Sequence, residues 1–108
     1  MLVTNNIGEV VSIKLVSGEE IIGKLEKSDD QTVMLHKPLL LLMTKDGPAF
    51  HPYMVTTDIM KENPKISFAK HTIVATAIPL SDFSEAYIEA TEPSRIEQVK
   101  KPGLILPH

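Results

Sequence analysis

Apolar and polar residues alternate along most of the first 78 positions, and a period of two is typical of half-buried β-strands. Over residues 10–16, Val11, Ile13 and Leu15 share one face, with Ser12 and Lys14 on the other. The alternation resumes over residues 19–27 after the turn signal Ser17-Gly18, which predicts a hairpin. Further extended segments are predicted over residues 32–43, 49–56 and 66–78.

Several residues interrupt these predicted strands. Gly23 lies in the middle of the second segment, where it indicates a sharp bend or a close backbone approach. Pro38 predicts a bulge or a local edge in the third segment. Between these two segments, Asp29 and Asp30 are expected to cap backbone amides of a turn.

The period changes after Pro79, because apolar residues then recur at helical spacing. The stripe predicts a short amphipathic helix that docks on the strands, in preference to binding a partner; it consists of Phe83, Ala86, Tyr87 and Ala90. Ser81 or Asp82 is available as N-cap, and Pro93 ends the pattern. Three acidic residues of this segment should face water: Glu85, Glu89 and Glu92. We therefore expect a β domain over residues 1–79, with residues 80–108 forming a helix and tail packed on it.

Two segments resemble the motifs of one family. The stretch VSIKLVSGEEIIGKLEKSDDQTVML, residues 11–35, is similar to the first motif of the Sm, LSm and Hfq family: Gly18 is followed by Gly23 five residues later and by the acidic Asp29 six residues further on. The sequence KHTI, which begins at Lys70, is similar to an element of the second motif of bacterial Hfq. With the C-terminal helix, the combination resembles small Sm-like proteins encoded by phages, of the cyanophage type.

This resemblance implies a mainly β fold, a small and strongly bent five-stranded antiparallel Sm-like barrel with a C-terminal helix. It also implies a homo-oligomeric ring, closed through strands near Tyr53 and Val74, that binds single-stranded RNA or DNA. The candidate nucleic-acid-binding residues are Lys70, His71, Gln31, Asp29 and Tyr53. Lys70 and His71 either line a central opening or serve as a solvated strand residue and an interface residue. Tyr53 either stacks on a base or packs in the core.

The chain departs from the family pattern at three places. Val33 occupies the position where eukaryotic and archaeal members have a base-reading Asn, and Gln31 replaces the aromatic residue of Hfq-like loops. Glu19 and Glu20 follow Gly18 and would repel phosphate on the opposite face. A ring scaffold that mediates protein assembly without binding nucleic acid is therefore the alternative.

Composition limits the remaining possibilities. The 108 residues carry a formal net charge of −3, so any contact with phosphates must be local. The chain has no cysteine, its four histidines lack metal-ligand spacing, and no catalytic or phosphate-cradling motif is present, so we expect no metal, no cofactor and no enzymatic activity. The longest apolar run, residues 39–43, is too short to cross a bilayer, and the N-terminus lacks a secretory pattern. We expect a cytoplasmic protein, in the host-cell cytoplasm if it is phage-encoded.

Overall fold

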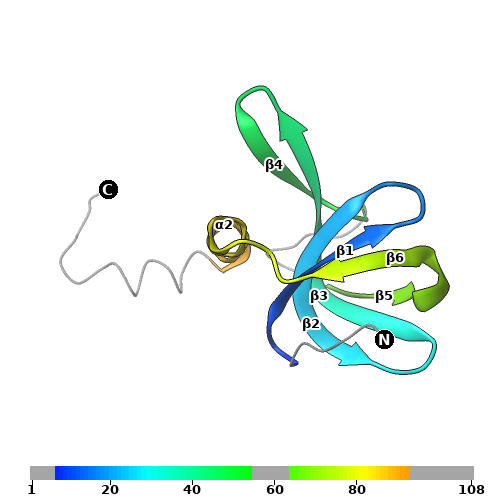
Figure 1. Cartoon of the computed structure of the whole chain (residues 1–108). Helices are drawn as coiled ribbons and strands as arrows, with labels where there is room; N and C mark the ends of the chain where they lie inside the picture. Colours follow the sequence, from blue (N-terminus) through cyan, green and yellow to red (C-terminus); the bar gives the residue numbers. More distant parts are fainter. Residues whose placement is uncertain (1–6, 55–63, 93–108) are drawn as a thin grey trace.

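The computed structural model describes residues 7–54 and 64–92 of the chain. These residues form six strands, a short 3-10 helix and one α-helix (Figure 1). In chain order they are β1 (Val10–Leu15), β2 (Glu20–Ser28), β3 (Thr32–Thr44), β4 (Gly47–Pro52), β5 (Lys65–Ala69), η1 (Lys70–Thr72), β6 (Ile73–Ala77) and α2 (Ser81–Thr91).

All strand pairs are antiparallel, in the order β4-β3-β2-β1-β6, with β5 on β3. Strand β3 has thirteen residues, so it can pair with β5 through its first half and with β4 through its second half. Within residues 7–54 and 64–92, no strand pairing joins the two ends of this path, and the sheet is open. The predicted mainly β fold with one C-terminal helix is confirmed at this level.

The bend in β3 lies at Lys37 and Pro38. The β2–β3 register shifts here, since Ile22 pairs with Leu39 but Lys24 pairs with His36, which leaves an extra residue on β3. Lys37 takes a φ of 52°, the left-handed region that side chains other than Gly rarely adopt. The bulge predicted from Pro38 is thus confirmed.

Gly23 lies across from this bend. A Cβ atom at Gly23 would lie 3.1 Å from the Cβ of Leu35 and 3.3 Å from the Cα of Pro38. The strands approach so closely only because position 23 has no side chain, so the second of the two motif glycines has a close-approach role. Gly18, by contrast, has a φ of 100° and forms the β1–β2 turn in open space.

Two apolar clusters cover opposite faces of the sheet. The larger lies inside the bend and consists of Val11, Ile13, Leu15, Ile21, Leu25, Val33, Leu35 and Phe68. The smaller lies beneath α2, where Tyr87 packs on Ile22 and Leu39, and Phe50, Phe83 and Ile88 surround them. The predicted docking of the helix on the strands is confirmed.

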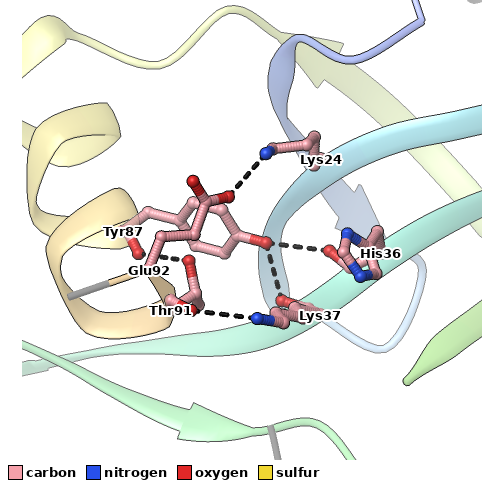
Figure 2. Close-up of polar contacts among 6 residues, drawn as sticks. All are labelled: Lys24, His36, Lys37, Tyr87, Thr91 and Glu92. Carbon is pink, nitrogen blue, oxygen red and sulfur yellow. Dashed lines mark hydrogen bonds and ion pairs between the residues drawn. The ribbon is translucent and has the colours of Figure 1, made fainter. Parts of the chain in front are cut away.

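Polar contacts fasten the helix to the bend in β3 (Figure 2). The Tyr87 hydroxyl donates to the carbonyl oxygens of His36 and Lys37, at 2.8 and 2.9 Å. The Lys37 Nζ donates in return to the Thr91 carbonyl oxygen at 3.0 Å. Burial is the main cause that raises the pKa of the Tyr87 hydroxyl. We call these three residues, Lys37, Tyr87 and Thr91, the helix latch.

Three details of the sequence interpretation are wrong. The extended segment predicted over residues 66–78 is two strands, because η1 interrupts it at Lys70–Thr72. The N-cap of α2 is Leu80, with no side-chain capping bond, and neither Ser81 nor Asp82 serves. Glu92 pairs with Lys24 where it was expected to face water.

The apolar stripe of α2 is also rotated from its expected position. Ala90 is exposed and Thr91 is buried, because Thr91 donates its hydroxyl to the Tyr87 carbonyl oxygen and lies against the strands. Glu85 and Glu89 are exposed, as predicted.

Candidate nucleic-acid interface

The turn between β2 and β3 is organised by Asp29. Its Oδ1 accepts hydrogen bonds from the backbone amides of Gln31 and Thr32, each at 2.9 Å, and from the Thr32 hydroxyl at 3.2 Å. The Thr32 amide, followed by the Gln31 amide, is the main cause that lowers the pKa of the Asp29 carboxyl. The predicted turn-capping role of Asp29 is confirmed, and this carboxylate oxygen is already committed to the turn.

The connection between β5 and β6 is a single 3-10 turn that carries Lys70 and His71. The Thr72 hydroxyl closes the turn by donating to the Ala69 carbonyl oxygen at 2.6 Å. The Thr72 carbonyl oxygen accepts from the Val16 amide at 2.7 Å, which fixes the turn to the end of β1. One side-chain bond and one backbone bond of Thr72 therefore fix the end of the turn that follows Lys70 and His71.

One backbone hydrogen bond joins these two turns. The Lys70 amide donates to the Gln31 carbonyl oxygen at 2.8 Å, directly beyond the pairing of Thr32 with Ala69. The bond lies at the end of the sheet where the β2–β3 turn and the β5–β6 connection are neighbours in Figure 1. Asp29, Gln31, Lys70 and His71 thus belong to one surface, which we call the loop pair.

The side chains of the loop pair suit contact with a polar ligand. Gln31 and His71 are exposed and Lys70 is half-buried. Gln31 is held by the bond from its own amide to Asp29 and by the bond from Lys70 to its carbonyl, so its side chain projects from a fixed backbone. This surface offers one cation, an imidazole and an amide, which match phosphate oxygens and base edges. It also carries the exposed Asp29 carboxylate, one oxygen of which is bonded within the turn.

Among the described residues, the hydrogen bond and the ring contact of Tyr53 lead to Pro38 and Phe68 and not to the loop pair. Its ring packs against Phe68 with centroids 5.2 Å apart and an interplanar angle of 53°, at the edge of the larger apolar cluster. The residue is half-buried, and its amide donates to the Pro38 carbonyl oxygen at 3.4 Å. These contacts support its role as a core residue, one of the two interpretations of the sequence.

The two glutamates expected to repel phosphate lie on the β1–β2 hairpin. Glu20 accepts from the Ser12 hydroxyl at 3.0 Å, and Glu19 accepts from the Ser17 hydroxyl at 2.8 Å. Both carboxylates are thereby oriented by the hairpin itself.

Sequence reasoning missed two residues that support these turns, Thr32 and Thr72. Each uses its hydroxyl locally, Thr32 on Asp29 and Thr72 on Ala69. The available signal was their spacing, because a Thr three residues after a turn-forming position is suited to such a bond.

Within residues 7–54 and 64–92, no group of three or more His, Asp or Glu side chains is arranged to hold a metal ion. The helices of this same part of the chain include none with the length and apolar character needed to cross a bilayer. A scan against protein-family models and a search of curated proteins found no match.

Proposed function

We propose that this protein is an Sm-like ring subunit that binds single-stranded nucleic acid, RNA or DNA, through the loop pair. The observation that supports this most is the hydrogen bond from the Lys70 amide to the Gln31 carbonyl. The two segments chosen by resemblance to separate family motifs are distant in sequence, yet this bond makes them neighbours on one surface.

Ring formation would proceed through strands β5 and β6. Each of them pairs with one of the described strands, β3 and β1 respectively, so each has a second edge that no described strand covers. A heterologous contact between β6 of one copy and β5 of the next would satisfy both edges, and repetition of that contact would close the ring. In this ring, the bent sheet of each copy would be the counterpart of the barrel of an Sm-like subunit.

Strand β4 ends next to Tyr53 and was the partner expected from the sequence, but β5 suits this pairing better. The Tyr53 amide bonds to Pro38 on β3, so the amides of positions 48, 50 and 52 point away from β3. Pro48 and Pro52 have no amide hydrogen, which leaves Phe50 as the single donor on that edge. By contrast, β5 and β6 contain no proline.

The ring would also explain how an acidic chain binds an anion. A single Lys70 is a weak phosphate site, but rotational repetition places one Lys70 from each copy around a common axis. The aromatic residue of Hfq-like loops is replaced by Gln31, so affinity would depend on charge and hydrogen bonds more than on stacking.

A scaffold ring that binds proteins is the second candidate. Apolar side chains are exposed on β6 and in the segment that follows it, with Val74 at 61%, Ile78 at 71% and Leu80 at 73%. A surface of this kind suits protein contacts.

The test combines a measurement of the oligomer mass with a measurement of nucleic-acid affinity. Native mass spectrometry should show a closed homo-oligomer. Fluorescence anisotropy with short U-rich, A-rich and single-stranded DNA oligomers at roughly 50 and 200 mM salt should then show affinity that falls with salt.

The Lys70→Ala variant should weaken that binding and reduce the slope of log affinity against log salt by roughly 0.7 for each phosphate that the lysine neutralises. Lys45→Ala is the matched control, because Lys45 is an exposed lysine at the tip of the β3–β4 hairpin. A monomer would exclude the ring. A ring without salt-dependent binding, or a Lys70→Ala ring with an unchanged slope, would exclude nucleic-acid binding by the loop pair.

A further inference from the structure

Helix α2 covers one end of an apolar face formed by β3 and β4. The other end of this face is exposed. The second half of β3 and strand β4, residues 39–44 and 47–52, form a hairpin whose base pairs with β2 and whose tip extends away from the other strands (Figure 1). We call it the arm. Leu39, at its base, lies beneath Tyr87 of α2.

The covered and open parts belong to one face of the arm. Leu39, Leu41 and Met43 alternate along β3, and alternate residues of a strand share a face. Met43 pairs with Pro48 and Leu41 with Phe50, so these partners lie on the same face. Towards the tip this face is open: Met43 is 69% exposed and Pro48 is exposed as well.

An uncovered apolar arm requires a partner for stability. Residues 39–41 of the arm also pair with β2, and the cluster beneath α2 reaches Phe50, so only residues 42–44 and 47–49 form a hairpin of two strands. Such a hairpin is marginally stable in water unless another element packs on it. The edge of β4 is poorly suited to strand pairing, because Pro48 and Pro52 leave Phe50 as its single amide donor. The occupant must therefore lie on the face of the arm.

The C-terminal tail begins beside the base of this face. The Thr91 carbonyl accepts from Lys37 and the Glu92 carboxylate pairs with Lys24, so the end of α2 lies against β2 and β3. Lys37 is two residues before Leu39, the first residue of the arm on β3. The tail, residues 93–108, starts with mostly polar residues and ends with the apolar run Leu104-Ile105-Leu106. Eleven residues lie between Glu92 and Leu104, and the twelve steps from one to the other span up to roughly 40 Å when extended. Six paired residues of the arm span roughly 20 Å.

We propose that the apolar run of the tail docks on the face of the arm of its own chain, over Met43 and Pro48. Its attachment at Glu92 favours the intrachain contact, because a short tether gives an effective concentration in the millimolar range. The docked run continues the apolar layer that Tyr87 begins. This contact does not depend on nucleic-acid binding or on ring formation.

The chain has no cysteine, which allows a clean cross-linking test. In the full-length Met43→Cys/Ile105→Cys variant, mild oxidation should form an intrachain disulfide about tenfold faster than in Lys27→Cys/Ile105→Cys. Lys27 is exposed near the β2–β3 turn, at the other end of the sheet from the arm tip. Equal rates in the two variants, or a disulfide that joins two chains, would overturn the proposal.

A second measurement uses the methionine methyl signals in NMR spectra of the full chain. Ile105→Asp should shift the Met43 signal and leave that of Met34, a half-buried residue in the first half of β3, unchanged. Val99→Asp, in the preceding part of the tail, is the control and should shift neither signal. A Met43 signal that is unaffected by Ile105→Asp would refute the contact.

Discussion

The hydroxyl of Tyr87 should be worth a measurable part of the stability of this protein. It is one donor of the helix latch, and its two acceptors are the carbonyl oxygens on either side of Lys37, which takes a left-handed conformation. The Tyr87→Phe variant keeps the ring and its packing on Ile22 and Leu39 but loses the donor. The substitution therefore isolates the polar part of the latch.

The expected loss of unfolding free energy in Tyr87→Phe follows from the hydrogen bonds that the hydroxyl makes. A net hydrogen bond contributes about 1 kcal/mol, and loss of a donor at a covered site adds to that cost, so we expect a loss of about 1–2 kcal/mol. For a domain of this size, such a loss lowers the melting temperature by about 5–12 °C. Tyr87→Ala also removes the ring from a buried position and should cost about 3–5 kcal/mol.

Thermal and urea unfolding followed by circular dichroism will measure both variants. If Tyr87→Phe melts within about 1 °C of the wild type, the hydroxyl does not stabilise the bend and the reasoning fails. If Tyr87→Phe is as destabilised as Tyr87→Ala, the loss is due to displacement of the helix and not to one bond.

Because of the same hydroxyl, we expect the stability of the protein to depend on pH in the alkaline range. The folded state keeps the phenol protonated above its ordinary pKa of 10.0, where the unfolded chain loses the proton. The unfolded state then binds fewer protons, so the stabilisation is complete below pH 10 and falls as the pH rises above it. Urea unfolding of the wild type and of Tyr87→Phe, from about pH 8 to about pH 11, should show the gap between them narrowing above pH 10. A constant gap would contradict the assignment.

Two further substitutions test the motif residues. Gly23→Ala should destabilise by about 1–2 kcal/mol in urea unfolding, because the new Cβ meets Leu35 and the backbone of Pro38. Gly18→Asn is the comparison: its side chain meets no neighbour, and it should cost about 1 kcal/mol through backbone strain alone, because the φ of Gly18 is 100°. Asp29→Ala should lower the melting temperature at neutral pH and lose its effect in acid, since the contribution of Asp29 is present above its ordinary pKa of 3.8 and is lost as the pH falls through the lowered folded value. An Asp29→Ala deficit that stays the same down to about pH 2 would show that the carboxylate charge has no part in the turn.

The sequence by itself determined the elements whose signal is local. Alternation over Val11, Ile13 and Leu15 marked β1, because a strand with one buried face must repeat every two residues. Helical spacing around Phe83 and Tyr87 marked α2 in the same way. Asp29 was identifiable as a turn residue, because its bonds reach only two and three residues along the chain.

Only the tertiary structure decided the features that depend on distant residues. No local pattern shows that the segment 66–78 breaks at Lys70, because its new partner there is Gln31. The left-handed conformation of Lys37 has no sequence signal either, and it accompanies bonds from Tyr87 and to Thr91. The loop pair was therefore proposed as separate motifs, and its assembly into one surface required the path of β3 between β2 and β5, since strand pairing fixes which turns become neighbours.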